Sequence, residues 1–487
     1  MDSRRAAQIL SKKMQRVIDA QRRIISFLIC IIIAFGATFA MAHYEESLNM
    51  IQIYVVFILF LAISLWVTEA VPPFAVGLLI VGLLIFFIGN SATNIEGQAD
   101  YIDVKTFVQT WSNSVIWLML GGFFLAEALK ITGLDKDLFR ISISKVGNNP
   151  KHIILGLMMA TGLASMIMSN TATTAMMIAS IMPFIDVVGH QNRVSKALLI
   201  GIPAAASIGG VGTIIGSPPN AIAVDAINNL AREGHSVPYI SFLDWMIYGV
   251  PIAIILMLIF WFILIKVYKI KNSPIEIDFL HKKELESQME RFNKRMVLGV
   301  LIVTVLLWLT SSMHGIPSAA ISGIPIIVLP MLGIITGVGV RKLPWDTLML
   351  VAGGLSLGIA IQQSGLADFF VSKISNYEFY DVVFLIIFAL ATVVFSNIMS
   401  NTATATILIP VATILPGVNP IEAAVVIGLS ASFALFLPVS TPPNAIAFST
   451  GYLKQSDFKL GGFWIGLLGP VLTILWVLLL SYLGFMA

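Results

Sequence analysis

Two short polar motifs interrupt the most apolar stretches of this 487-residue chain. The first is Ser169-Asn170-Thr171, and the second, 231 residues later, is Ser400-Asn401-Thr402. Ser, Asn and Thr are residues that cap helix amino termini, and an apolar run follows each triplet. The first N–H groups of a helix are unpaired and partly positive, so they can hold a carboxylate, to which the hydroxyl and amide side chains also donate. The triplets therefore predict an anion site built without basic side chains, and neither Lys nor Arg occurs in the interrupted stretches.

A second motif follows each triplet. It reads Gly216-Ser217-Pro218-Pro219-Asn220 in the first case and Ser440-Thr441-Pro442-Pro443-Asn444 in the second. Proline lacks an N–H group and clashes with the preceding turn, so each motif predicts an opened helix. Freed carbonyl oxygens at membrane depth need partners, and Na⁺ is a suitable one. We expect one oxygen cage for Na⁺ per half: Ser165, Ser169, Asn170 and Gly216 in the first, and Ser396, Met399 (through its carbonyl), Asn401 and Ser440 in the second.

The paired motifs indicate an internal duplication. A third match, Gly121-Gly122 against Gly353-Gly354, precedes them in the same order. One isolated triplet is better explained by helix packing, because small hydroxyl residues pack membrane helices, but two copies with paired breaks favour a site. Five predicted crossings separate the triplets, and because five is odd the copies are inverted in the membrane. Inverted repeats are typical of secondary transporters with a site near the midplane.

The elements that position these motifs are membrane helices. Hydrophobic residues make up 57% of the chain and charged residues 11%, against about 25% charged residues in soluble domains. This composition excludes a soluble enzyme and a single-anchor receptor. It predicts an all-α polytopic membrane protein with about 11 transmembrane helices, since roughly 20 apolar residues cross a bilayer. We expect re-entrant hairpins at 153–188 and 382–415, broken helices five and ten at 197–226 and 423–450, and unbroken spans at 24–42, 51–67, 74–88, 114–132, 245–268, 297–309, 319–337, 348–361 and 462–485.

Four regions follow from this layout. They are a cytoplasmic amphipathic leader (1–23), a first transmembrane half (24–268, with the repeat beginning at about 51), a charged cytoplasmic linker (269–296, with Lys282/Glu286 and Glu290/Lys294 pairs at helical spacing) and a second transmembrane half (297–487). With re-entrant hairpins and a cytoplasmic amino terminus, all but three of the 29 basic side chains face the cytoplasm, the exceptions being Lys105, Arg232 and Lys373. Full crossings would place the charged linker outside. The charge distribution thus predicts a multi-pass plasma (inner) membrane protein with its carboxyl terminus outside.

Other classes of function have weaker support. Glu69 and Glu127 are the acidic side chains nearest the bilayer and are candidates for proton coupling, although salt-bridged or interfacial positions explain them better. A membrane hydrolase needs a base beside its serine, and the interrupted stretches contain neither His nor Lys. The chain contains no Walker-type phosphate loop, so we do not expect ATP to drive it directly.

At these motifs the sequence resembles the divalent anion/sodium symporter family of di- and tricarboxylate transporters, some of which carry sulfate. The resemblance rests on the paired triplets, the Ser217-Pro218 and Thr441-Pro442 elements and the segment from Trp66 to Pro72. It implies two re-entrant hairpins, a homodimer, and an elevator motion of the substrate-bearing unit. It also implies that the oxygen cages bind Na⁺ and that the substrate site comprises Asn170, Thr171, Ser217, Pro218, Ser400, Asn401, Thr402, Thr441 and Pro442.

These observations together predict a transporter rather than an enzyme. We expect Na⁺-coupled symport of C4 dicarboxylates such as succinate, fumarate and malate, in which bound Na⁺ lowers the cost of holding a dianion where no basic side chain lies nearby. Two alternatives stay open within the family. One is Na⁺-independent dicarboxylate exchange, and the other is transport of citrate, 2-oxoglutarate or sulfate.

Overall fold

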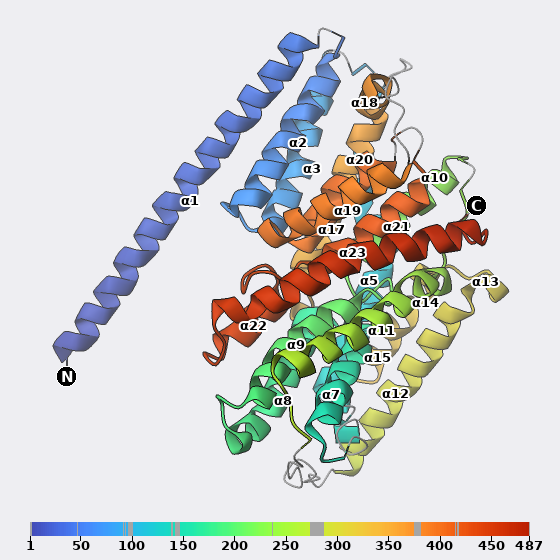
Figure 1. Ribbon diagram of the computed structural model, residues 1–487. Helices are drawn as coiled ribbons and strands as arrows, with labels where there is room; N and C mark the ends of the chain where they lie inside the picture. Colours follow the sequence, from blue (N-terminus) through green and yellow to red (C-terminus); the bar gives the residue numbers. More distant parts are fainter. Residues whose placement is uncertain are drawn as a thin grey trace. The chain divides into compact units, whose positions relative to one another are not determined.

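The computed structural model describes residues 2–486 apart from 46, 91, 93, 96–100, 138–139, 142–146, 236, 273–286, 375–380, 414 and 416–417. All regular elements in these ranges are helical (Figure 1). Nine of the described helical segments are long and apolar enough to cross a membrane, and three shorter apolar segments accompany them. The prediction of an all-α polytopic membrane protein is therefore confirmed. The count of about 11 crossings and the entry of the hairpins from one face stay predictions.

Two compact units make up the chain, and each draws on both predicted halves. The first unit contains Met1–Trp111 and Met349–Lys373, and the second contains Ser112–Leu348 and Ile374–Ala487. Both interrupted hairpins and both broken helices lie in the second unit. Positions 273–286 of the predicted linker, with its Lys282/Glu286 pair, lie outside the described residues.

The first unit is built on helices α1 (Asp2–Tyr44), α2 (Met50–Thr68) and α3 (Pro73–Gly89), which pack in sequence order. Helix α1 continues without interruption through the predicted boundary between leader and first span. Most of α17 (Trp345–Gln363) belongs to this unit and crosses α3 at two glycines. A Cβ atom at Gly353 would lie 2.3 Å from the Cα atom of Gly77, so this crossing depends on the absence of side chains. The remaining elements are α4 (Lys105–Gln109), η1 (Thr110–Ser112), which reaches the unit boundary, and α18 (Leu366–Ile374).

The second unit contains two sets of helices in the same order. The first set is α5 (Ser114–Thr132), α7 (Pro150–Ser165), α8 (Asn170–Val188), α9 (Arg193–Gly210), α10 (Pro218–Arg232) and α11 (Phe242–Val267). The second set is α19 (Asp381–Ile398), α20 (Asn401–Thr413), α21 (Pro420–Ser430) with η3 (Ala431–Phe433), α22 (Pro442–Ser449), η4 (Gln455–Asp457) and α23 (Phe458–Tyr482). Between them lie α12 (Gln288–Leu309), α13 (Ser311–His314), α14 (Ser318–Ile321), α15 (Gly323–Met331) and α16 (Gly337–Arg341).

The helices that follow the breaks exchange partners between the two sets. Helix α10 packs against α20 and α21, whereas α22 packs against α8 and α9. Each helix after a break therefore contacts the hairpin helix and the pre-break helix of the other set. The exchange is reciprocal, as expected for two duplicated copies.

Two segments differ in detail from the predictions. The expected span at 319–337 is divided into α14 and α15 at Ser322, whose hydroxyl donates to Ser318 O at 3.0 Å, a contact that bends helices. Helix α12 begins at Gln288, inside the predicted linker. Glu290 forms a capping box with Ser287, and Lys294 forms an ion pair with Asp137. The end of the predicted linker is thus the first part of a long apolar helix.

Candidate functional site

Both Ser-Asn-Thr triplets lie at helix starts, as predicted. Ser169 is the N-cap of α8, and its Oγ accepts a hydrogen bond from Ala172 N at 3.3 Å. Ser400 occupies the same place before α20, where its Oγ accepts from Ala403 N at 3.2 Å. The helices before them, α7 and α19, end within four residues of these serines. Each triplet therefore forms the turn of a helical hairpin.

The side-chain amide of Asn170 joins the first hairpin to the first break. Two of its neighbours, Ala206 O and Gly216 O, are carbonyls that can only accept, so the amide nitrogen must face them. In this orientation the nitrogen donates to Ser165 Oγ at 2.6 Å, to Ala206 O at 3.1 Å and to Gly216 O at 3.2 Å. Three of the four residues predicted for the first cage thus meet. The fourth, Ser169, uses its hydroxyl as the N-cap of α8 instead.

Close backbone approach makes this cluster possible. A Cβ atom at Gly210 would lie 2.3 Å from the Asn170 amide, so only glycine leaves room for that side chain. A Cβ atom at Gly216 would lie 2.5 Å from Gly210 O and 3.0 Å from Ser165 O. Carbonyl oxygens therefore converge on this point, and oxygen donors of this type suit a hard cation such as Na⁺.

The hydroxyl of Thr213 gives a second link between the hairpin and the break. It donates to Met166 O and accepts from Gly216 N at 3.1 Å. This residue was not predicted from the sequence. The available signal was a single threonine within the small-residue run just before Gly216.

The breaks in the two helices are stabilised by the asparagines of the Pro-Pro-Asn motifs. Asn220 donates to Gly210 O at 2.9 Å and to Thr213 O at 2.7 Å. Asn444 donates equivalently to Leu435 O at 3.3 Å and to Leu437 O at 3.0 Å. These four freed carbonyls therefore find their partners within the protein, in the amide groups of the two asparagines.

The second cage is more open than the first. Ser396 Oγ and Asn401 Oδ1 are buried and have no hydrogen-bond partner among the described residues. Met399 is buried, while Ser440 donates its hydroxyl to Ala434 O at 3.0 Å and to Leu437 O at 2.8 Å. Within the described ranges no hydrogen bond joins the four predicted residues to one another. Two unpartnered oxygens are what a cation site in this hairpin would use.

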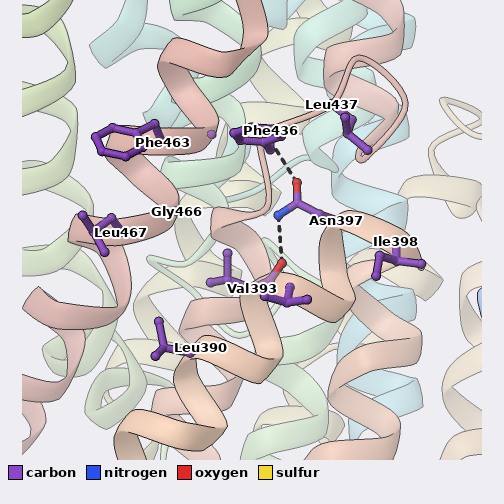
Figure 2. A pocket seen from close by; sticks show the side chains of 11 residues that line it. Leu390, Val393, Asn397, Ile398, Phe436, Leu437, Phe463, Gly466 and Leu467 are labelled. Carbon is purple, nitrogen blue, oxygen red and sulfur yellow. Dashed lines mark hydrogen bonds between the residues drawn. The ribbon is translucent and has the colours of Figure 1, made fainter.

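Asn397 fixes the second hairpin to the chain before the second break. Its amide donates to Val393 O at 2.8 Å and accepts from Phe436 N at 3.0 Å, as the dashed lines in Figure 2 show. Beside it lies a pocket of about 420 Å³ lined by apolar side chains, including Leu390 and Phe463 (Figure 2). Asn397 uses both amide atoms internally, and no residue of either triplet lines this pocket. The pocket therefore does not suit a dianion.

The predicted substrate residues differ in exposure between the two sets. Thr171 is exposed, whereas its counterpart Thr402 is buried. Ser217 and Thr441 are both buried N-caps, of α10 and α22, and the prolines after them begin those helices. Ser217 Oγ lies 3.1 Å from the hydroxyl of Ser432, whereas Thr441 Oγ1 accepts from Asn444 N at 3.4 Å. No hydrogen bond in the described part of the chain joins the two triplets directly.

The prediction that Glu69 and Glu127 are the acidic side chains nearest the bilayer is corrected by their positions. Glu69 is exposed at the carboxyl end of α2 with φ 49°, and Glu127 is half-buried on α5. Neither is the most buried acid. Asp225 on α10 is fully buried, and the sequence analysis missed it although it is the one acidic residue within the predicted broken span 197–226.

Comparison with known proteins places these features in context. The model of the family described as "Sodium:sulfate symporter transmembrane region" matches residues 21–485. The sodium-dependent dicarboxylate transporter SdcS of Staphylococcus saprophyticus is 32% identical over 445 residues, which are 84% of this chain and 82% of that protein. SdcS of Staphylococcus aureus is 30% identical over 457 residues, which are 87% of this chain and 85% of that protein.

Solved structures share the fold at low sequence identity. MtrF of Neisseria gonorrhoeae, described among antimetabolite efflux pumps, has a TM-score of 0.54 at 12% identity and covers 85% of this chain and 96% of its own. The YdaH transporter of Alcanivorax borkumensis has a TM-score of 0.53 at 14% identity and covers 85% of this chain and 99% of its own.

Proposed function

Because the chain belongs to the sodium:sulfate symporter family, we propose that it is a secondary active transporter that imports C4 dicarboxylates together with Na⁺. The family consists of membrane transporters, not enzymes. The choice of substrate is supported by the relatives at about 30% identity, whose names are those of sodium-dependent dicarboxylate transporters.

The observation that carries the proposal is the cluster of Ser165, Asn170 and Gly216. It places a capped helix start, a broken helix and converging oxygens together without a basic side chain. In our proposal Na⁺ binds there first: the Asn170 amide turns its oxygen towards the cation, and Ser165, Ser169, Asn170 and Gly216 supply the ligands. A second Na⁺ binds Ser396, the Met399 carbonyl, Asn401 and Ser440. Each cation offsets part of the cost of holding a dianion away from water.

The dianion then binds between the two hairpin tips. Its carboxylates accept hydrogen bonds from the helix starts and side chains of both triplets and of the elements at the breaks. The proposed contacts come from Asn170, Thr171, Ser217, Pro218, Ser400, Asn401, Thr402, Thr441 and Pro442. Reciprocal packing of α10 on α20 and of α22 on α8 supports a site shared by the two sets.

The proposal extends to assembly and movement. We place the amino terminus in the cytoplasm and the carboxyl terminus outside, because the basic residues concentrate in the segments that this orientation puts inside. The working unit is a homodimer surrounded by lipid, in which the substrate-bearing part of each copy moves across the membrane by an elevator mechanism.

Uptake into proteoliposomes tests the proposal. Purified protein is reconstituted, an inward Na⁺ gradient is imposed, and uptake of radiolabelled succinate is followed with choline replacing Na⁺ in the control. Uptake that collapses in choline supports symport. Uptake that needs preloaded dicarboxylate and ignores Na⁺ indicates exchange and overturns the proposal. Competition by unlabelled citrate, 2-oxoglutarate and sulfate identifies the preferred anion, and stronger competition by any of these than by succinate overturns the C4 assignment.

A further inference from the structure

A fully buried carboxylate lies on the helix that begins at the first break. Asp225 is on α10, two turns after Ser217, and is 0% exposed. Its Oδ2 atom accepts hydrogen bonds from Asn113 Nδ2 and Asn229 Nδ2, both at 3.0 Å. Its Oδ1 atom is buried and has no hydrogen-bond partner among the described residues. The two oxygens of one carboxyl group thus have very different surroundings.

The orientation of both amides is fixed by a further hydrogen bond. Asn113 is the N-cap of α5, and its Oδ1 accepts from Val115 N at 2.8 Å. Asn229 Oδ1 accepts from the guanidinium of Arg232 at 2.5 Å. Each amide must therefore turn its NH₂ group towards Asp225. Because Oδ2 receives two donors and Oδ1 receives none, Oδ1 is the oxygen that can take a proton without losing an existing hydrogen bond.

No cation pairs with this carboxylate in the described surroundings. Arg232 is exposed and donates to Asn229 Oδ1 and Ser114 Oγ rather than to Asp225. The helices packed on α10 contribute few ionisable groups. Helix α21 contributes Glu422, and α20 (Asn401–Thr413) contributes none. Helix α5 contributes Glu127 and Lys130, which lie more than three turns beyond Asn113. Burying an ionised carboxylate without a cationic partner costs far more free energy than burying a neutral carboxyl group. A proton on Oδ1 removes the charge and keeps both amide hydrogen bonds.

We propose that Asp225 is a proton-binding site and that the protein carries H⁺ together with Na⁺ and the dicarboxylate. The carboxylate takes one proton from water to become a carboxylic acid, and it returns that proton to water when the site reopens. In this proposal water reaches the site from the end of α10 that carries Asn229 and the exposed Arg232. Transport of the proton depends on the proposed function, whereas binding of the proton does not.

Proton entry during uptake tests the transport step. Proteoliposomes containing a pH-sensitive dye are given a Na⁺ gradient and succinate at an alkaline pH where succinate is fully ionised and brings no proton. We expect the interior to acidify as wild-type protein takes up succinate. In Asp225→Asn, the Asn amide reproduces the hydrogen bonding of a neutral carboxyl, and the protons entering per succinate should fall from about one to zero. Wild-type uptake without acidification, or unchanged acidification in Asp225→Asn, overturns the proposal.

A matched control and a second variant guard against loss of folding. Glu422→Gln neutralises the other buried acid near α10 and should leave the protons per succinate unchanged. Asp225→Glu retains a carboxyl group and should retain acidification, so its loss there overturns the assignment.

Infrared spectroscopy of purified protein in lipid nanodiscs reports proton binding without any transport. The carbonyl band of a protonated carboxyl, present in wild type and Glu422→Gln and absent from Asp225→Asn, supports the site even if succinate is not a substrate. Identical spectra for wild type and Asp225→Asn overturn it.

Discussion

Ser217 Oγ lies 3.1 Å from Ser432 Oγ, and both side chains are buried. Ser217 caps the helix after the first break, whereas Ser432 lies in η3, just before the second break. The contact therefore joins the two duplicated sets at the level of their breaks. Because Ser217 is also a proposed substrate ligand, this hydroxyl pair orients a group in the binding region.

Ser432→Ala should weaken substrate binding without preventing folding. Loss of one hydrogen bond between neutral groups costs about 1 kcal/mol, which corresponds to roughly a fivefold rise in the KM for succinate. The measurement is initial uptake rate against succinate concentration at saturating Na⁺. Ser449→Ala is the control, since this hydroxyl is exposed and, among the described residues, bonds only within its own helix, to Ile446 O. An unchanged KM in Ser432→Ala would show that the pair does not orient Ser217.

Asn170→Ala and Asn401→Ala should each abolish uptake. The first removes the amide that joins Ser165 to Gly216, and the second removes the buried Asn401 Oδ1 atom. Size-exclusion chromatography should still give folded protein. Asn192→Ala, which removes an N-cap from the start of α9 away from the hairpin tips, should keep uptake. Wild-type uptake in either triplet variant contradicts the placement of the site.

Gly210→Ala should impair Na⁺ binding specifically. The added Cβ atom would lie 2.3 Å from the Asn170 amide and displace it from the carbonyls that it contacts. We expect the Na⁺ concentration for half-maximal uptake to rise at least about tenfold, with overpacking costing about 1–3 kcal/mol of stability. Gly299→Ala is a matched control on α12, where an added Cβ atom meets nothing within 4 Å. Equal Na⁺ dependence of the two variants would refute the role of Gly210.

Asn220→Ala should lower thermal stability. It removes the donor of Gly210 O and leaves Thr213 O with only the weaker hydrogen bond from Gly216 N at 3.3 Å, and an unsatisfied buried carbonyl costs about 1–3 kcal/mol. A clear fall in Tm of the detergent-solubilised protein is expected. Asn90→Ala is the control. It removes an exposed hydrogen bond to Phe86 O, and we expect it to unfold close to the wild-type temperature. Similar Tm values for both variants would mean that water replaces the Asn220 amide.

The helix starts and breaks of the site could be predicted from the sequence because their causes are local. Ser169 caps α8 through a hydrogen bond to a backbone N–H group three residues later, and Pro218 is suited to the first position of α10, where its missing N–H group costs nothing. The roles of Asn220 and Thr213 could not be predicted, since their acceptors depend on how an opened backbone folds back. The partner of α10 was also beyond the sequence, because motif spacing is equally compatible with packing on its own hairpin.

Asp225 is a different case. Its position inside a predicted membrane segment was visible in the sequence, and an acid there is a functional candidate by default. Its burial and its two amide donors became apparent only once α5 and α10 were placed together.

The reciprocal packing of α10 and α22 makes the structure of each repeat depend on the other. Neither repeat encloses its own hairpin helix alone, because the helix after the break of the other repeat packs against it. A substitution that displaces α10 therefore also disturbs α20, the hairpin helix of the second set.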